Sequence, residues 1–403
     1  MTTKNRAGEY LSILGFAIFL LVPSLDVVLK YFGLKGVAGY LVFGFTGLFL
    51  SYKFVWPLFR KLTEKQAIVL AALTFAVMIA VVGYVYPIAN SGGFGGGSDA
   101  NDALIIGATE LIHGRYPFYQ KTYLGNPIAP MPGALLLAAP FVFFGLYAVQ
   151  NIFWLAVFFT AVRNHLKSTV YALGLLWLIL VFCPSVLQNL VTGTDHISNT
   201  IYVLTAMWLM IKAIPNSEAS VLSKLLPTIL LGVGLSSRSN FIFLVPLLFS
   251  ILVQNSDWKT AFKYLTISGA ACVLVTLPFW IYDPSGFTPF TVQADKVTRF
   301  EEILPFARIV VPLSGMLLAF ALSLTKMNSD CHVFLRNCAI VQLFTVLFMS
   351  ALASIHGGRL NLFFDHIGYG MFILFFGVFA GWIILRERDD TLGSSLTTVN
   401  PKA

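Results

Sequence analysis

Charged residues are scarce in this chain. Asp, Glu, Lys and Arg make up 11% of the 403 residues, whereas hydrophobic residues make up 57%, and the mean hydropathy is +0.81. A soluble domain carries roughly 25% charged residues. The composition therefore excludes an ordinary soluble domain. It predicts an all-α polytopic membrane protein, in which each spanning helix uses about 20 apolar residues.

Motifs for metals, nucleotides and disulfides are also lacking. The four cysteines lie outside the polar segment 89–130, and no pair has metal-ligand spacing, so we expect no structural disulfide. No dinucleotide or P-loop glycine fingerprint is present. A hard cation needs several converging oxygens, and the segment offers two acids, Asp99 and Asp102. We expect no cofactor and no divalent metal.

Apolar runs predict 11 to 13 membrane helices in a single domain, residues 1–388, followed by a disordered tail, residues 389–403. The first run is expected to be an uncleaved anchor. The prolines and Gly145 make the run 131–146 short or broken, and 222–253 is a paired, partly re-entrant unit. The remaining candidates are 10–29, 36–56, 67–88, 148–163, 169–187, 197–213, 260–282, 304–325, 333–355 and 362–385.

The net charge of +8 does not indicate a nucleic acid partner, because the basic residues stand mostly at the ends of apolar runs. The positive-inside bias places such residues in the cytoplasm. This rule puts segment 89–130 outside the membrane, facing outward from a bacterial inner membrane. The residues that this rule assigns to the cytoplasmic side are Lys4, Arg6, Lys53, Arg60, Lys61, Lys65, Arg163, His165, Lys167, Lys259, Lys263, Lys326, Arg336, Arg386 and Arg388.

The outer segment has the features of a functional loop. A glycine-rich stretch precedes Asp99 and Asp102, and apolar residues then recur at helical spacing from 101 to 113. This pattern predicts an amphipathic helix at the membrane surface, ended by Gly114. One acid is explained as an N-cap, with Asp102 the better candidate. The other acid is left for function.

Several short patterns resemble a known family. Asp99, the helix, the run HGRYPFY (113–119) and a proline-rich approach to the next apolar run follow one another. This order resembles the GT-C superfamily of integral membrane glycosyltransferases, most closely the bacterial mannosyltransferases that use polyprenyl-phosphate donors. The segments 184–199, 234–248 and 278–287 are similar to later family loops, although Leu187 stands where the family has Gly before Gln188.

The resemblance implies transfer of a sugar, with inversion, from a polyprenyl-phosphate donor to a glycolipid, glycan or protein acceptor. A carboxylate can take the proton of the acceptor hydroxyl, and Asp99 is preferred over Asp102 as that base. Cations stabilise the phosphate leaving group, and Arg115 and Arg238 are the main candidates. The remaining candidate substrate-binding residues are His113, Tyr116, Tyr119, Lys121, Gln188, Asp195, His196 and Arg359.

Structural explanations stand beside these roles. Arg115 and Lys121 can be interfacial cations that snorkel toward water, Asp195 can be a helix cap, and Arg359 can pair with Asp365. Two other function classes also remain. An envelope polysaccharide polymerase or ligase would use cations of the segment 283–303, including Lys296. A lipid-linked sugar transporter or flippase would show repeats and midplane charges, and neither is visible.

Overall fold

The computed structural model describes residues 13–91, 99–325, 330–362 and 369–397. Apart from one isolated bridge between Lys121 and Pro127, the regular structure in these ranges is helical. The N-terminal part comprises a helix over 13–21, then η1 (Val22–Ser24), α2 (Leu25–Leu50), the π-helical η2 (Ser51–Val55), α3 (Trp56–Phe59) and α4 (Glu64–Ala89). The predicted all-α class is confirmed for the described residues.

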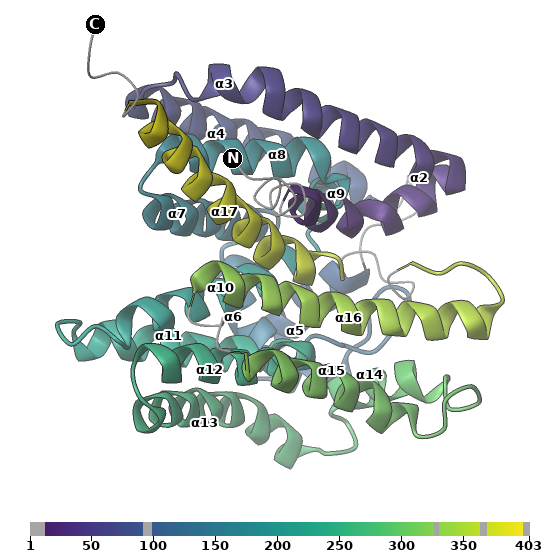
Figure 1. Cartoon of the computed structure of the whole chain (residues 1–403). Helices are drawn as coiled ribbons and strands as arrows, with labels where there is room; N and C mark the ends of the chain where they lie inside the picture. Colours follow the sequence, from purple (N-terminus) through teal and green to yellow (C-terminus); the bar gives the residue numbers. More distant parts are fainter. Residues whose placement is uncertain (1–12, 92–98, 326–329, 363–368, 398–403) are drawn as a thin grey trace, which may run out of the picture.

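The remaining elements follow along the chain in the ranges 99–213 and 221–397, whose α-helices Figure 1 labels. The first contains α5 (Asp99–Ile112), η3 (Pro117–Tyr119), α6 (Pro132–Phe143), α7 (Val149–Leu166), α8 (Thr169–Phe182), α9 (Pro184–Thr192) and α10 (His196–Ala213). The second contains α11 (Val221–Leu235), η4 (Ser239–Leu244), α12 (Val245–Asn255), α13 (Trp258–Tyr282), α14 (Thr288–Thr298), α15 (Ala307–Ser323), α16 (Cys331–Gly357) and α17 (Met371–Thr397).

Several helices have the length and composition of membrane spans. Four described segments meet both criteria, namely Ile13–Phe59, Glu64–Ala89, Trp258–Tyr282 and Cys331–Gly357. The bent pair α8 and α9 would add a fifth if it counts as one span. Shorter apolar helices include α6, α11 and α15. These are the features of a helical membrane protein, while the total of 11 to 13 spans stays a prediction.

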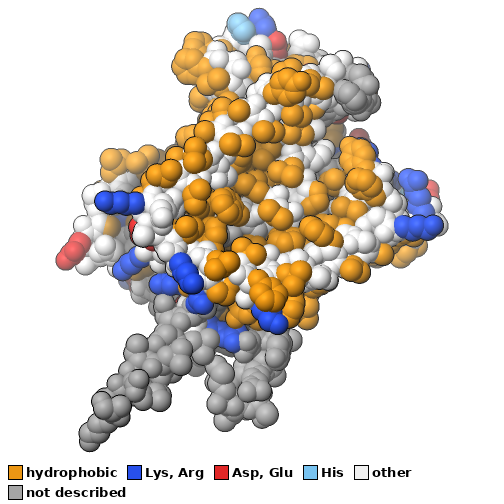
Figure 2. Space-filling view, turned by 90° about the horizontal axis from the view of Figure 1, so that it is seen from above, with side chains coloured by type: hydrophobic (Ala, Val, Ile, Leu, Met, Phe, Trp, Pro, Cys, Tyr) orange, Lys and Arg blue, Asp and Glu red, His pale blue; other side chains and the backbone are white. Residues whose placement is uncertain are grey.

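Much of the apolar surface faces outward. Val69, Leu73, Val77 and Tyr84 are exposed along α4, and their spacing places them on one side of the helix. Figure 2 shows hydrophobic side chains across the middle of one face and Lys and Arg toward its margins. Exposed apolar patches of this extent mark an interaction surface. Contact with membrane lipid is the interaction that a helical membrane protein offers for such a surface.

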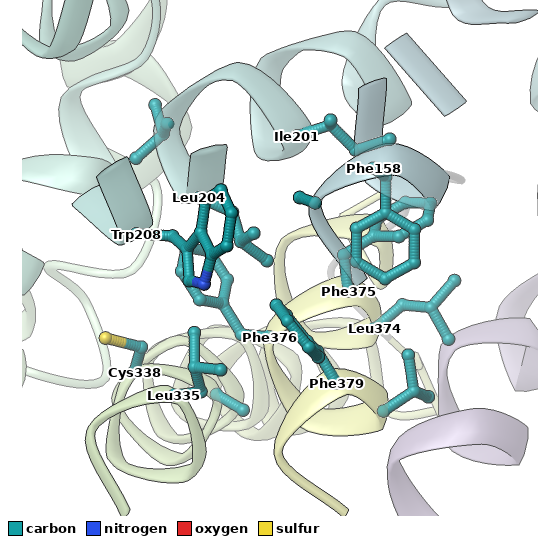
Figure 3. Packing of buried hydrophobic residues seen from close by; sticks show 14 of the residues in the cluster. Phe158, Ile201, Leu204, Trp208, Leu335, Cys338, Leu374, Phe375, Phe376 and Phe379 are labelled. Atoms are coloured by element: carbon teal, nitrogen blue, oxygen red, sulfur yellow. The ribbon is translucent and has the colours of Figure 1, made fainter. Parts of the chain in front are cut away.

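The interior is built on α7, α10, α16 and α17. Phe158 of α7 lies against Phe375 and Phe379 of α17, with ring centroids 5.0 and 5.8 Å apart. Leu204 of α10 and Leu335 of α16 are fully buried in the same cluster (Figure 3). This packing fixes α10, whose N-terminal end carries part of the candidate site.

The helix limits differ from the predicted ones at four places. The predicted runs 10–29 and 36–56 are joined, because α2 continues through residues 30–35 with a kink at Gly33. The run 169–187 is not one helix, because the chain bends by 84° between α8 and α9, where Pro184 begins the second helix. The helix predicted over 362–385 is α17, which starts later, at Met371. It continues to Thr397 and so enters the segment predicted as a disordered tail. The segment 283–303 is not only a loop, since it contains α14.

Loops predicted to be cytoplasmic come together at one end of the molecule. The carboxylate of Glu64, the first residue of α4, accepts from the Ser168 hydroxyl and from the N–H of Thr169, the first residue of α8, at 3.0 to 3.2 Å. Arg386 of α17 lies 4.2 Å from the Tyr171 ring centroid. The membrane side of this end remains the prediction of the positive-inside bias.

Candidate functional site

The predicted amphipathic helix is present as α5. Ala103, Leu104 and Ala108 are buried and belong to a small apolar cluster with Leu135 of α6. Gly114, with φ of +68°, follows the helix, and its N–H donates to Leu111 O at 3.0 Å. Glycine adopts this left-handed conformation without a steric penalty. The sequence therefore predicted both the helix and its end.

The two acids of α5 bind different parts of the same loop. Asp99 Oδ2 accepts from Asn126 Nδ2 at 3.0 Å. Asp102 Oδ2 accepts from the Tyr123 N–H at 2.7 Å. Because α5 begins at Asp99, Asp102 lies inside the helix, and the interpretation of Asp102 as the N-cap is wrong. Asp99 Oδ1 is buried, and no residue that the structure describes gives it a hydrogen bond.

The three basic candidates of the outer segment lie on its surface. Arg115 forms a two-point ion pair with Glu110, at 2.6 and 2.7 Å, and 57% of its side chain is exposed. The hydrogen bond from Arg115 holds the pKa of Glu110 below its usual value. His113 contacts the Thr109 carbonyl through Nδ1. Lys121 is exposed and forms the bridge with Pro127.

The two predicted aromatic residues attach the outer segment to the end of α13. Tyr116 Oη donates to the backbone oxygens of Phe279 and Asp283, at 3.1 and 3.2 Å. Tyr119 Oη donates to Asp283 Oδ2 at 3.0 Å, and its ring is exposed. Asp283 also accepts from the Ser285 hydroxyl and the Gly286 N–H. These hydrogen bonds, that from Ser285 foremost, lower the pKa of Asp283.

A buried ion pair lies deeper in the molecule. Arg238 stands between α11 and η4, as predicted, and its Nη2 donates to Asp195 Oδ1 at 2.7 Å. The Asp195 side chain is fully buried, and that of Arg238 is 13% exposed. Asp195 Oδ2 accepts from Asn199 Nδ2 at 3.0 Å. Asp195 is not a side-chain cap of α10, so its carboxylate serves Arg238 and Asn199.

Arg238 lines a cavity of about 140 Å³. A second cation, Lys296 of α14, lines the same cavity, and its Nζ lies 3.5 Å from the Tyr369 hydroxyl. Asn240, Gln293 and Gln342 add amide groups to a lining that is otherwise largely apolar. Arg238 Nε is buried, and none of the described residues gives it a hydrogen-bond partner. A guanidinium donor left unpaired beside a cavity is costly, and an anionic ligand would satisfy it.

His196 lies behind this cavity. It is buried, and its ring packs against Tyr369 and Phe372, with centroids 5.7 and 5.4 Å away. Both aromatic residues line the cavity. In the part of the chain that the structure describes, His196 Nδ1 has no hydrogen-bond partner. The imidazole therefore supports the aromatic wall of the cavity.

The other predicted residues lie elsewhere. Gln188 belongs to α9, and its side-chain oxygen is 3.4 Å from Asn189 Nδ2. Arg359 is exposed after the end of α16, and neither residue lines the Arg238 cavity. The predicted partner of Arg359, Asp365, lies outside the described residues.

The acids of α5 are connected to the cavity through the loop that they hold. Asn126, which donates to Asp99, is three residues from Ala129, which lines the cavity. Three residues span at most about 11 Å between Cα atoms. The Thr288 hydroxyl holds this stretch by donating to Ile128 O at 2.6 Å. Asn101 of α5 also packs closely against the backbone at Gly193, two residues before Asp195. A Cβ added at Gly193 would lie only 2.5 Å from Asn101 Oδ1.

Sequence reasoning did not assign a site role to Asn240, Gln342 or Tyr369, and it considered Lys296 only for the polymerase alternative. Asn240 and Gln342 stand within apolar runs and exchange hydrogen bonds of 2.8 and 3.0 Å. Amides inside apolar runs are the signal that could have found them, because a buried polar group needs a partner.

Comparisons with family models, curated proteins and solved structures find no match to this chain. Among the described residues, no group of three or more His, Cys, Asp or Glu side chains could hold a metal ion.

Proposed function

We propose that this protein is an integral membrane glycosyltransferase that uses a polyprenyl-phosphate sugar as donor. The observation that carries the proposal is the cavity lined by both Arg238 and Lys296. Two cations beside one small cavity favour an anionic group, and phosphate accepts several such hydrogen bonds. The largely apolar remainder of the lining suits a ligand attached to a lipid.

Asp195 prepares Arg238 for this role. Among the described residues, one carboxylate pairs with one of the two cations, so this part of the lining keeps an excess of positive charge. Because Asp195 holds Nη2, the guanidinium is oriented before a ligand arrives. Preorganised charges stabilise a developing anion without reorganisation during the reaction.

Asp99 is the proposed general base. Its Oδ2 is engaged with Asn126, whereas its Oδ1 has no partner among the described residues, and in this proposal Oδ1 accepts the proton of an acceptor hydroxyl. The hydroxyl oxygen then bonds to the anomeric carbon as the bond from that carbon to the phosphate oxygen breaks. The electron pair leaves with the polyprenyl phosphate, whose charge Arg238 and Lys296 stabilise, and the anomeric configuration inverts.

A polysaccharide polymerase or ligase is the second candidate. The observation in its favour is that Lys296 comes from the segment 283–303. Such an enzyme would transfer a glycan from a lipid diphosphate, whereas the first candidate transfers one sugar from a lipid monophosphate. A transporter or flippase would move either lipid without breaking the glycosidic bond.

Transfer of radiolabel from polyprenyl-phosphate monosaccharides, in membranes that contain the protein, separates these candidates. Mannose-like hexoses are the first donors to test, with membrane glycolipids as acceptors. We expect labelled glycan in these membranes, and about 10- to 100-fold poorer donor use with Arg238→Ala or Lys296→Ala, since a hydrogen bond to a charged group contributes about 1.5–3 kcal/mol.

Arg308→Ala is the matched control, because Arg308 forms an exposed ion pair with Glu301 and is not in the cavity lining. It should leave donor use unchanged. No transfer from any monophosphate donor, with transfer from a lipid diphosphate glycan, would replace the proposal with the second candidate. Normal donor kinetics in both cavity variants would remove the phosphate assignment.

A further inference from the structure

The start of α10 carries three buried polar side chains in a row. Asp195 directly precedes the helix, and Asn199 and Tyr202 follow at spacings of four and three residues. Helical residues at these spacings are neighbours on one side of the helix. Polar groups buried this deeply are costly unless each has a partner. The proposed transfer uses only Asp195, so Asn199 and Tyr202 need their own explanation.

Hydrogen bonds connect the row in a fixed direction. The Tyr202 hydroxyl donates to Asn199 Oδ1, and Asn199 Nδ2 donates to Asp195 Oδ2 at 3.0 Å. An ionised carboxylate can only accept hydrogen bonds. The amide nitrogen of Asn199 must therefore face Asp195, which leaves its oxygen for Tyr202. The other carboxylate oxygen, Asp195 Oδ1, accepts from Arg238 Nη2 at 2.7 Å.

Packing against two other helices holds the far end of this row. The Tyr202 ring meets Trp154 of α7 edge-on, with ring centroids 5.4 Å apart. A Cβ at Gly234 of α11 would lie 3.2 Å from Tyr202 Cδ2, so the backbone of α11 also lies close to the ring. Aromatic pairs of this geometry add stability beyond the area that they bury. The core of the molecule thus fixes the hydroxyl to which Asn199 is bound.

Arg238 depends on this row for its orientation. Its guanidinium has one printed anchor, the hydrogen bond from Nη2 to Asp195 Oδ1, and Arg238 lines the cavity. A single hydrogen bond orients a guanidinium only if the accepting carboxylate cannot rotate. Asn199 holds the second oxygen of Asp195 and so prevents that rotation. Groups that orient a ligand-binding residue from behind can matter nearly as much as the residue itself.

We propose that Tyr202 is a positioning residue for Arg238, acting through Asn199 and Asp195. The inference rests on the proposed role of Arg238 at the donor phosphate. Tyr202 is fully buried and is not in the cavity lining, so it acts without touching a substrate. Loss of its hydroxyl frees the Asn199 amide to turn. The Asp195 carboxylate can then rotate, and the Arg238 guanidinium is no longer directed at one place in the cavity.

Binding of undecaprenyl phosphate, the leaving group of the proposed reaction, tests this role without the need for turnover. The full-length protein in detergent is titrated with this lipid, and the rise in its thermal unfolding midpoint gives the Kd. Tyr202→Phe keeps the ring and removes only the hydroxyl. We expect its Kd to be about 5- to 10-fold higher than that of the wild type, the effect of one hydrogen bond.

Tyr40→Phe is the matched control. The Tyr40 hydroxyl donates to the backbone oxygens of Leu21 and Phe182, at 3.1 and 2.7 Å, and Tyr40 is not in the cavity lining. Its loss should lower the unfolding midpoint of the unliganded protein and leave the Kd unchanged. An equal increase in Kd in both tyrosine variants would overturn the proposal, because general loss of stability would then explain the weaker binding.

A double-mutant cycle with Arg238→Ala separates positioning from a structural role. Residues that act through one another have non-additive effects. Once Arg238 is absent, Tyr202→Phe has nothing to position and should not weaken undecaprenyl phosphate binding any further. The same 5- to 10-fold loss in the Arg238→Ala protein would overturn the proposal, because Tyr202 would then act independently of Arg238.

Trp154→Phe covers the case in which Tyr202→Phe does not fold. Among the described residues, Trp154 Nε1 has no hydrogen-bond partner, so this change breaks no hydrogen bond and only loosens the contact with Tyr202. It should raise the Kd about 2- to 5-fold, within the range of one aromatic pair. Wild-type affinity in whichever of the two variants folds would overturn the positioning role.

Sugar transfer, measured in parallel, distinguishes this inference from the proposed function. Binding of undecaprenyl phosphate that depends on Tyr202 and Arg238, without transfer of any sugar, would refute the glycosyltransferase and support the positioning role. Transfer with an unchanged Kd in Tyr202→Phe would refute the positioning role alone. Absence of binding to the wild type would overturn both.

Discussion

Arg238 and Asp195 form an ion pair of 2.7 Å that joins the turn between α11 and η4 to the start of α10. The Asp195 side chain has no solvent exposure. Because the Asp195 carboxylate is closed to water whereas Arg238 also lines the cavity, the carboxylate depends on Arg238 for compensation, and each residue has a structural role besides any role toward a ligand.

The first prediction is that Asp195→Asn destabilises the fold. Loss of one partner leaves the other charge buried without compensation, which costs about 3–5 kcal/mol. Unfolding in detergent by chemical denaturant measures this free energy. The double variant Asp195→Asn with Arg238→Gln should regain part of it, because no net charge stays buried. A single variant as stable as the wild type would contradict a dominant role for the pair.

The second prediction separates the two acids of α5. Asp99→Asn keeps an oxygen for Asn126 but removes the proton acceptor, so transfer should fall about 10²- to 10⁴-fold at an unchanged protein level. Asp102→Asn retains an oxygen that can accept from the Tyr123 N–H and should have a mild effect. Turnover of both variants is measured with the radiolabelled donor. The reverse order of effects would make Asp102 the base.

Local patterns in the sequence predicted much of the fold. Apolar periodicity indicated α5, and Gly114 indicated its end, because both depend on neighbouring residues alone. The bend at Pro184 was missed because α8 and α9 form one apolar run, and α14 was missed because its sequence is polar. The position of Arg238 between two helical segments followed from the short apolar runs on either side of it within 222–253.

Partners across the chain were not predictable in the same way. Arg115 and Arg238 were both assigned to phosphate, yet Arg115 is paired with Glu110 at the surface, whereas Lys296 joins Arg238 at the cavity. Which cations share a cavity depends on how α14 folds back against η4 and α16. No spacing within a single segment contains that information.

The third prediction concerns the attachment of the outer segment to α13. The pKa of Asp283 is lowered in the folded state by hydrogen bonds from Ser285, the Gly286 N–H and Tyr119. A depressed carboxyl pKa adds stability above the unfolded value, about 3.9, and that stability is lost as the pH falls through the folded pKa. The unfolding midpoint of Asp283→Asn should thus be lower than that of the wild type at neutral pH.

The difference in midpoint between the wild type and Asp283→Asn should shrink as the pH is reduced below about 4. Tyr119→Phe removes one donor to Asp283 and should show a smaller difference with the same pH dependence. Thermal unfolding across a pH series measures both. A difference that stays constant down to pH 3 would assign the effect to the shape of the side chain and not to its charge.

The last prediction tests the close approach of α6 to the cavity region. A Cβ at Gly133 would lie 2.1 Å from Val233 O and 2.8 Å from the backbone carbon of Ser236, and the Gly133 N–H donates to Ser236 O at 3.1 Å. Since both obstacles are backbone atoms, Gly133→Ala must displace α6, at a cost of about 1–3 kcal/mol. The shift should carry Ala129, four residues earlier, away from its place in the cavity lining and raise the KM for donor.

Gly269→Ala is the matched control, because nothing lies within 4 Å of its Cβ position in α13, and alanine there should add about 0.5–1 kcal/mol of stability. Unfolding free energy and donor KM are measured for both variants, and a Gly133→Ala protein with the stability and KM of the wild type would show that the approach of α6 does not hold the cavity in shape.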